Sequence, residues 1–167
     1  MPFSISLIDK DEIQLGEQTI SLDESLNKIP GVYVQNRYNF AQDQRISIRG
    51  FGSRAAFGVR GIKILYDGIP LTLADGQSQT DSLDLSSAER IEVIRGPVSA
   101  LYGNASGGVI SIYSETGFGQ PFFEIRPLFG SFGLFRINAK AGGQLNNFSY
   151  LINISRLNYD GFRDHSN

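Results

Sequence analysis

Short runs of alternating apolar and polar residues predict a set of strands in the first part of the chain. Phe3–Ile8 alternates before it turns apolar, which is the pattern of a strand with one buried face. Further strands are expected where β-branched residues lie between turns: Val32–Val34, Arg45–Arg49, Ile62–Tyr66, Ile91–Arg95 and Val109–Tyr113. One helical turn is expected over Val98–Tyr102.

A helix is expected between the first two strands, over Ser21–Ile29. Its apolar side chains, Leu22, Leu26 and Ile29, fall on one face. Ser21 followed by Glu24 is a capping-box pattern that predicts Ser21 as the N-cap. The helix and the strands predict a core made of Ile5, Leu7, Leu22, Leu26, Ile46, Ile48, Ile64, Val93 and Ile110.

After about Gly119 the alternation becomes longer and more regular. Phe122–Phe129 predicts a strand interrupted by Pro127. Two further strands place apolar residues on one side, namely Phe135, Ile137, Ala139, Ala141, Phe148, Tyr150, Ile152 and Ile154. Short connections at 130–133 and 144–147 make this a meander of hairpins.

Two kinds of sheet have this period. One apolar and one polar face over about ten residues is typical of a membrane barrel strand. A soluble antiparallel sheet with one wet face alternates in the same way. Periodicity alone therefore leaves both readings open.

Composition removes several classes of function. The net charge of −2 argues against a nucleic-acid binder. Without cysteine the chain has no disulfide, zinc–thiolate site or thiol nucleophile. The single histidine, His165, lies close to the end of the chain and is a poor candidate for a catalytic triad. We therefore expect no enzyme, no metal site and no cofactor.

Four segments together resemble the plug domain of TonB-dependent outer-membrane receptors. They are SLDESLNKIPGVYV (21–34), ISIRGF (46–51), ILYDGIP (64–70) and AERIEVIRGPVSALYGNASGGVISI (88–112). Each is weak alone, but their order and spacing are specific. The later hairpins resemble the first barrel strands of the same family, and this favours the membrane reading of that segment.

The resemblance implies a fold and a division of the chain. We expect an α+β plug with a small mixed sheet over residues 1–118, followed over residues 119–167 by the first antiparallel strands of an incomplete transmembrane β-barrel. The segment that couples to TonB would lie upstream of Pro2, and most of the barrel would lie outside this chain.

Two arginines end strands and are followed by glycine: Arg49 and Arg95. Glycine lets the backbone turn there, which would leave the guanidinium heads unobstructed. In the family, arginines at these motif positions contact glutamates on the inner barrel wall, and the resemblance implies that role here. Ordinary surface ion pairs are the alternative.

Loops between the plug strands are the candidate ligand-facing surface. The stretch from Arg37 to Lys63 is strongly basic. The loops Arg37–Gln44, Ser53–Gly61 and Leu71–Gln79 would form the floor of a ligand vestibule. The residues expected to face the ligand are Arg37, Tyr38, Arg54, Phe57 and Gln77. Basic loops favour an anionic ligand, although they could also serve only to keep the loops solvated.

The resemblance implies an outer-membrane receptor that imports a ferric siderophore with energy from TonB. Vitamin B12 or a glycan would be a different cargo for the same machinery. A free-standing periplasmic binding module is the alternative from another class. An enzyme is disfavoured because no convergent catalytic set is present.

Overall fold

The computed structural model describes residues 3–35, 43–55, 58–80 and 82–161. These residues belong to two compact units, unit 1 (Met1–Ser114) and unit 2 (Glu115–Asn167). The expected boundary between residues 118 and 119 stays a prediction.

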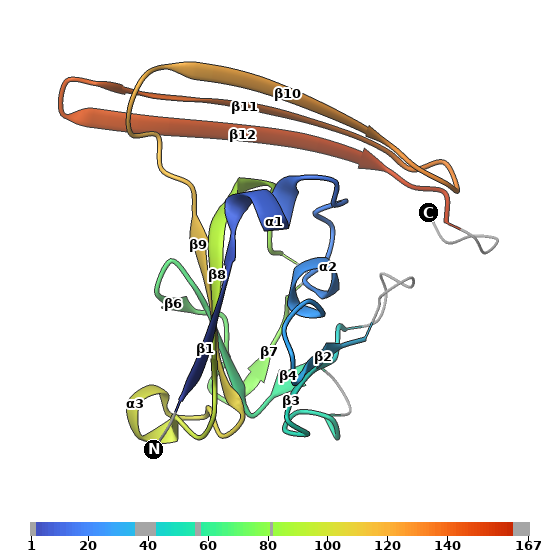
Figure 1. The fold of residues 1–167 in the computed structure, drawn as a ribbon, viewed down its shortest axis with the longest axis vertical. Helices are drawn as coiled ribbons and strands as arrows, with labels where there is room; N and C mark the ends of the chain where they lie inside the picture. Colours follow the sequence, from blue (N-terminus) through green and yellow to red (C-terminus); the bar gives the residue numbers. More distant parts are fainter. Residues whose placement is uncertain (1–2, 36–42, 56–57, 81, 162–167) are drawn as a thin grey trace. The chain divides into compact units, whose positions relative to one another are not determined.

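A five-stranded mixed sheet organises unit 1 (Figure 1). Its strands, in spatial order, are β1 (Ser4–Asp9), β8 (Ala88–Arg95), β9 (Gly108–Ser114), β5 (Ile62–Tyr66) and β6 (Ile69–Pro70). Neighbouring strands are antiparallel except β5 and β9, which run parallel. The small mixed sheet expected for the plug is thus confirmed.

Short elements complete unit 1. Two small antiparallel pairs are formed by β2 (Val32–Val34) with β3 (Ile46–Ile48) and by β4 (Val59–Arg60) with β7 (Gln77–Ser78). The helical segments are α1 (Lys10–Gln14), α2 (Asp23–Leu26), the 3-10 turn η1 (Leu85–Ser87) and α3 (Ser99–Tyr102). The single turn predicted before Tyr102 is confirmed as α3.

The main core lies between one face of this sheet and the segments around α1, α2, β2 and β3. Its buried side chains include Ile8, Ile13, Leu22, Leu26, Ile46, Ile48, Ile62, Ile64, Ile91, Val93, Ile110 and Ile112. A smaller cluster of Val98, Ala105 and Val109 packs with Leu65, Ile94 and Tyr102. The connection Gly96–Gly107 therefore has a core of its own.

The first strand was predicted with the wrong face inward. Ile5 and Leu7 are 66% and 59% exposed, whereas Ile8 is 2% exposed. Side chains alternate across a strand, so the buried position of Ile8 places Ser4 and Ser6 on its side of the sheet. Ile5 and Leu7 point to one face of the strand and Ile8 to the other, so the sequence alone does not show which face is buried. In the structure the face with Ile8 is the buried one.

The helical part also differs from the prediction. Residue 22, not Ser21, is the N-cap of α2, and it makes no side-chain cap. Helix α1 was missed, although Asp9 is its N-cap and accepts a hydrogen bond from the backbone N–H of Glu12 at 3.0 Å. A five-residue helix is too short to produce a visible apolar period.

Unit 2 is a meander of three antiparallel strands. They are β10 (Phe122–Phe129), β11 (Phe135–Leu145) and β12 (Phe148–Asn158), in that order. Pro127 does not interrupt β10, since it pairs in register with Ile137. The missing N–H is tolerated because β10 is an edge strand. The expected few antiparallel strands are confirmed, and they form an open sheet.

One face of this sheet is apolar and the other polar. The exposed apolar side chains include Phe123, Ile125, Phe129, Ile137, Ile152 and Ile154. The register pairs Ala139 with Ile154 and Ala141 with Ile152, so the apolar stripe runs across the strands. No helix among the described residues is long and apolar enough to cross a membrane.

Candidate functional site

Four loop segments of unit 1 meet one another and form what is called here the loop cluster: residues 49–54, 58–61, 73–78 and 103–107. The backbone N–H of Gly107 donates to the carbonyl of Gly61 at 2.8 Å. The Asn104 side chain donates to the carbonyl of Gly76 at 3.4 Å. The pairing of β4 with β7 joins Arg60 to Gln77. Segments far apart in sequence therefore build one surface.

Two glycines allow this close approach. Gly58 has a φ of +59°, and a Cβ there would lie 2.8 Å from the Gln77 side chain. Gly76 has a φ of +82°, and a Cβ there would lie 2.0 Å from the Asn104 amide. Any larger residue would force the loops apart, so these glycines fix where Gln77 and Asn104 lie.

The loop cluster presents basic side chains to solvent. Arg54 is exposed, and its guanidinium has no hydrogen-bond or ion-pair partner among the described residues. Arg60 lies 4.0 Å from the Asp75 carboxylate and donates to Gln77 Oε1 at 3.4 Å. Both of these contacts are long and exposed, so they hold Arg60 only weakly.

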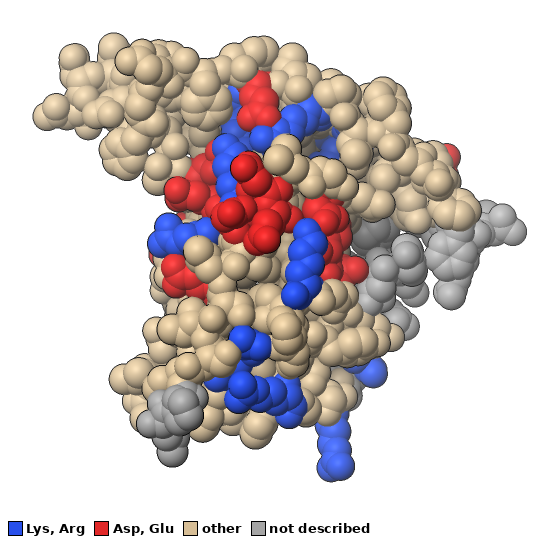
Figure 2. Space-filling view, in the orientation of Figure 1, with Lys and Arg blue, Asp and Glu red and all other residues tan. Residues whose placement is uncertain are grey.

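The charges of unit 1 are unevenly distributed. Figure 2 shows acidic side chains of unit 1, with some basic ones among them, toward α1, and basic side chains toward the opposite end. Asp9, Asp11 and Glu12 at the α1 end are exposed. The surface around the loop cluster is therefore the one that would attract an anion.

The predicted ligand-facing residues divide into two groups. Arg37, Tyr38 and Phe57 lie outside the described residues. Arg54 and Gln77 both belong to the loop cluster, but only Arg54 is exposed. Gln77 is half-buried, and its Oε1 accepts a long, exposed hydrogen bond from Arg60 at 3.4 Å. Its role as a ligand-facing residue stays a prediction.

Arg49 directly follows β3, and its predicted contact with the barrel wall stays a prediction. It is exposed and has a φ of +50°, so the chain turns sharply there. Its backbone N–H donates to the carbonyl of Gly31 at 2.9 Å. Within the described residues its guanidinium has no partner. The head is therefore free to bind a carboxylate that approaches unit 1.

Arg95 is different, and the expectation of an unobstructed head is wrong for it. Nη2 donates to Ser4 Oγ at 2.6 Å and to Ser6 Oγ at 2.9 Å, while Nη1 donates to the carbonyl of Pro30. Sequence reasoning missed these partners because Ser4 and Ser6 were assigned to the outer face of the first strand. With Ile8 on the inward face of β1, the side chains of Ser4 and Ser6 turn toward Arg95.

The loop between α1 and α2 is held by one carboxylate. Glu24 accepts hydrogen bonds from the backbone N–H groups of Thr19, Ile20 and Ser21 at 2.7, 2.9 and 3.1 Å. Burial raises the pKa of Glu24 above its ordinary value, and the three backbone hydrogen bonds oppose that rise. The contact to Ser21 is the half of the predicted capping box that forms.

Two charged groups of β8 pair within unit 1. Arg90 Nε donates to Glu92 Oε1 at 2.9 Å, and the guanidinium lies 4.0 Å from the centre of the Tyr113 ring. The hydrogen bond with Glu92 raises the pKa of Arg90. Arg90 therefore remains a cation bound to its own strand and its neighbour.

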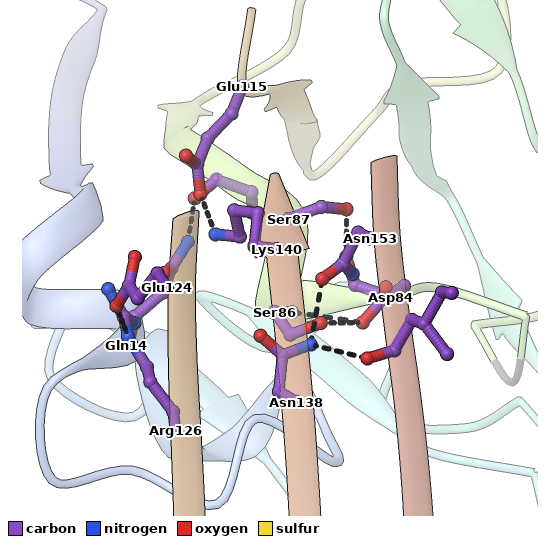
Figure 3. Close-up of polar contacts among 12 residues, drawn as sticks. Gln14, Asp84, Ser86, Ser87, Glu115, Glu124, Arg126, Asn138, Lys140 and Asn153 are labelled. Atoms are coloured by element: carbon purple, nitrogen blue, oxygen red, sulfur yellow. Dashed lines mark hydrogen bonds and ion pairs between the residues drawn. The ribbon is translucent and has the colours of Figure 1, made fainter. Parts of the chain in front are cut away.

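The polar face of unit 2 carries its own network (Figure 3). Lys140 forms an ion pair with Glu115, and Arg126 forms one with Glu124. Asn138 donates to Asn153 Oδ1 at 2.7 Å across β11 and β12. Of these pairs, Asn138 and Asn153 join the adjacent strands β11 and β12, and complementary amides in such cross-strand positions stabilise the pairing of the two strands.

Known proteins resemble this chain in sequence and in fold. Residues 1–109 match the family model described as the TonB-dependent receptor plug domain. The vitamin B12 transporter BtuB of Photobacterium profundum is 32% identical over 143 residues, which is 84% of this chain and 22% of the relative. BtuB of Vibrio vulnificus is 34% identical over 114 residues, 68% of this chain and 18% of the relative. The chain thus spans about a fifth of the length of these curated relatives.

Solved structures share the fold at lower identity. The ferric preacinetobactin receptor BauA of Acinetobacter baumannii has a TM-score of 0.75 at 19% identity, covering 96% of this chain and 23% of the receptor. The ferric yersiniabactin uptake receptor FyuA of Yersinia pestis has a TM-score of 0.66 at 22% identity, covering 86% of this chain and 22% of the receptor. Both matches extend beyond the plug, so they include strands of unit 2.

Proposed function

The chain belongs to the TonB-dependent receptors through its plug domain, and we propose that it is part of an outer-membrane receptor that imports a ligand with energy from TonB. In such a receptor unit 1 would lie inside the barrel lumen, and unit 2 would supply the first strands of the wall. The observation that carries the proposal is the family match together with the open sheet of unit 2, which has one apolar face.

A ferric siderophore is the ligand we favour. The loop cluster exposes Arg54, which has no partner among the described residues, and it holds Arg60 only weakly. An anionic ferric chelate would gain from these cations, and aromatic or hydroxyl groups near them would complete a pocket. Solved relatives with this fold include receptors for ferric preacinetobactin and ferric yersiniabactin. The loop residues Arg37, Tyr38 and Phe57 belong to the same proposal.

Vitamin B12 is the second candidate, because the curated relatives are B12 transporters. Cyanocobalamin is close to neutral overall, so basic loops would give it little electrostatic advantage. A glycan would likewise gain little from cations and would need planar aromatic surfaces instead. Salt dependence of binding therefore separates these cargoes from an anionic chelate.

A free-standing periplasmic module is less consistent with unit 2. Such a module would cover its apolar sheet face, whereas Phe123, Ile152 and Ile154 are 70%, 55% and 66% exposed. Lipid around a barrel would cover them.

In a complete receptor Arg49 would be the residue of unit 1 best placed to meet a carboxylate of the barrel wall. Arg95 could do so only after it loses its present partners.

The test is a complete receptor that carries this chain in place of the matching N-terminal portion of a relative. Radiolabelled ferric siderophores and cyanocobalamin are offered separately, in cells with and without TonB. We expect retention in the outer membrane, binding of the ferric chelate, and uptake only with TonB. Binding of cyanocobalamin alone would replace the favoured cargo, and uptake without TonB would contradict the proposed mechanism.

An Arg54→Ala variant of that receptor sharpens the choice of ligand. We expect ferric chelate affinity to fall about two- to fivefold, as exposed ion pairs suggest, with the larger effect at low salt. Lys10→Ala is the matched control, since it removes the same charge from α1, away from the loop cluster. Equal effects of the two variants, or unchanged affinity at low salt, would contradict an electrostatic role for Arg54.

A further inference from the structure

β1 buries fewer apolar side chains than β9, so hydrophobic burial stabilises its place in the sheet less. β1 is an edge strand that pairs only with β8 (Figure 1). Its one buried apolar residue is Ile8, whereas β9 buries Val109, Ile110 and Ile112 completely. Hydrophobic burial is the main force that fixes a strand, so β1 depends more on polar contacts than its neighbours do.

The two ends of β1 are attached differently. Near its C-terminal end, Ile8 is buried and α1 follows at once, with Ile13 only 1% exposed. Gln14 of α1 donates to the carbonyl of Ala88 in β8 at 2.7 Å in a buried contact. At the N-terminal end, Ser4 and Ser6 bring hydroxyl groups in place of buried apolar side chains. These hydroxyls accept from Arg95.

The guanidinium of Arg95 donates hydrogen bonds to three acceptors. Nη2 reaches both Ser4 and Ser6, and Nη1 reaches Pro30 in the turn before β2. Nε is buried and has no hydrogen-bond partner among the described residues. The side chain is therefore held through its terminal nitrogens alone. Hydrogen bonds from a charged donor are stronger than neutral ones, so each lost serine removes a substantial contact.

We propose that Arg95 is a clasp that holds the N-terminal end of β1 on the sheet, and that departure of β1 is what frees Arg95. The clasp consists of Arg95 with Ser4, Ser6 and the carbonyl of Pro30. Peeling β1 from its N-terminal end takes Ser4 and Ser6 away first. Arg95 then keeps only Pro30, and Nη2 is open to a new acceptor such as a carboxylate.

Because of the clasp, Arg95 can take a new partner only after β1 has left, whereas Arg49 can take one before. With β1 in place, the guanidinium of Arg49 has no partner in the described part of the chain, whereas that of Arg95 loses its serine partners only when β1 departs. The use of this order in transport rests on the proposed function, in which a pull arrives from upstream of β1. The clasp itself is a property of this chain and is tested without any ligand or TonB.

The test is amide hydrogen exchange of the full chain in detergent micelles, comparing β1 with β9. Variants are Arg95→Gln, the pair Ser4→Ala with Ser6→Ala, and all three changes together. We expect Arg95→Gln and the serine pair each to speed exchange in β1 about tenfold, the order of one charge-assisted hydrogen bond. Exchange in β9 should stay unchanged. The triple variant should be no faster than Arg95→Gln, since the serines then have no partner to lose.

Arg90→Gln is the matched control, because it removes an arginine from the same strand that does not contact the serines or Pro30. It should leave exchange at Ser4–Ser6 unchanged. If the Arg95→Gln variant fails to fold, the double serine variant tests the clasp by itself, because it keeps the Arg95 guanidinium. Unchanged β1 exchange in that pair, additive effects in the triple variant, or equal acceleration in β9 would each overturn the clasp. Failure of uptake in a complete receptor would overturn the proposed function and leave the clasp standing.

Discussion

Single polar side chains fix several turns of unit 1. Glu24 satisfies three backbone donors of one loop, and Arg95 gathers acceptors from β1 and from the turn before β2. Such contacts organise segments that contain few buried apolar residues. Their effect on stability is therefore measurable one residue at a time.

Glu24 is expected to titrate above its ordinary pKa of 4.5, because burial disfavours the charged carboxylate. A raised pKa in the folded chain means that the folded state holds this proton more tightly than the unfolded state. The stabilisation from Glu24 is then fully present below about 4.5 and is lost as the pH rises through the raised value. Carbon NMR of the side-chain carboxyl measures the midpoint. A midpoint at or below 4.5 would contradict the burial argument.

Arg49 is expected to bind the barrel wall in a complete receptor and to make no ligand contact. Replacing it with glutamine removes a cation that has no partner among the described residues of this chain. Ligand affinity should stay nearly intact, while the plug should loosen, seen as faster hydrogen exchange or greater antibiotic leakage. Lost ligand binding with unchanged plug protection would show that this arginine faces the ligand.

At the scale of elements, the sequence predicts the strands of three or more residues and misses α1 and the two-residue strands. Strands of unit 1 with several adjacent β-branched residues, such as β5 and β9, lie where they were expected. α1 was missed because it has too few residues to show a period, and β4 and β7 because each is only two residues long. The buried face of β1 was predicted wrongly because apolar residues lie on both faces of that strand.

The corrected face of β1 makes a prediction about stability. Ile8→Ala should destabilise residues 1–118 by about 2–5 kcal/mol, since it empties a buried site. Ile5→Thr should change stability by about 0.5 kcal/mol or less, because that side chain is exposed and threonine suits a strand. Urea unfolding of the two variants compares them directly. An equal loss of unfolding free energy in the two variants would contradict the burial of Ile8 and the exposure of Ile5.

The candidate site was only partly visible in the sequence. The basic character of the loops follows from residue type, and the exposure of Arg49 is consistent with the glycine that follows it. The contacts of Arg95 could not be predicted, because they join positions 4, 6, 30 and 95 and depend on the register of an edge strand. Local pattern does not contain such long-range pairing.

At the scale of the whole molecule, the two units make different demands on their surroundings. Unit 1 has a buried core and polar loops, which suits a domain that can fold in water. Unit 2 exposes Phe123, Phe129, Ile152 and Ile154 on one face of an open sheet. An apolar sheet with unpaired edges associates with other sheets unless lipid, detergent or further strands cover it.

Size-exclusion chromatography of residues 1–118 and of the full chain, each with and without detergent, tests the central claim most directly. We predict that residues 1–118 run as a soluble monomer in both conditions. The full chain should aggregate in water and become monodisperse only in detergent, which covers the apolar face of unit 2. A monodisperse, detergent-free monomer of the full chain would contradict the account, because the last three strands would then form an ordinary soluble antiparallel sheet.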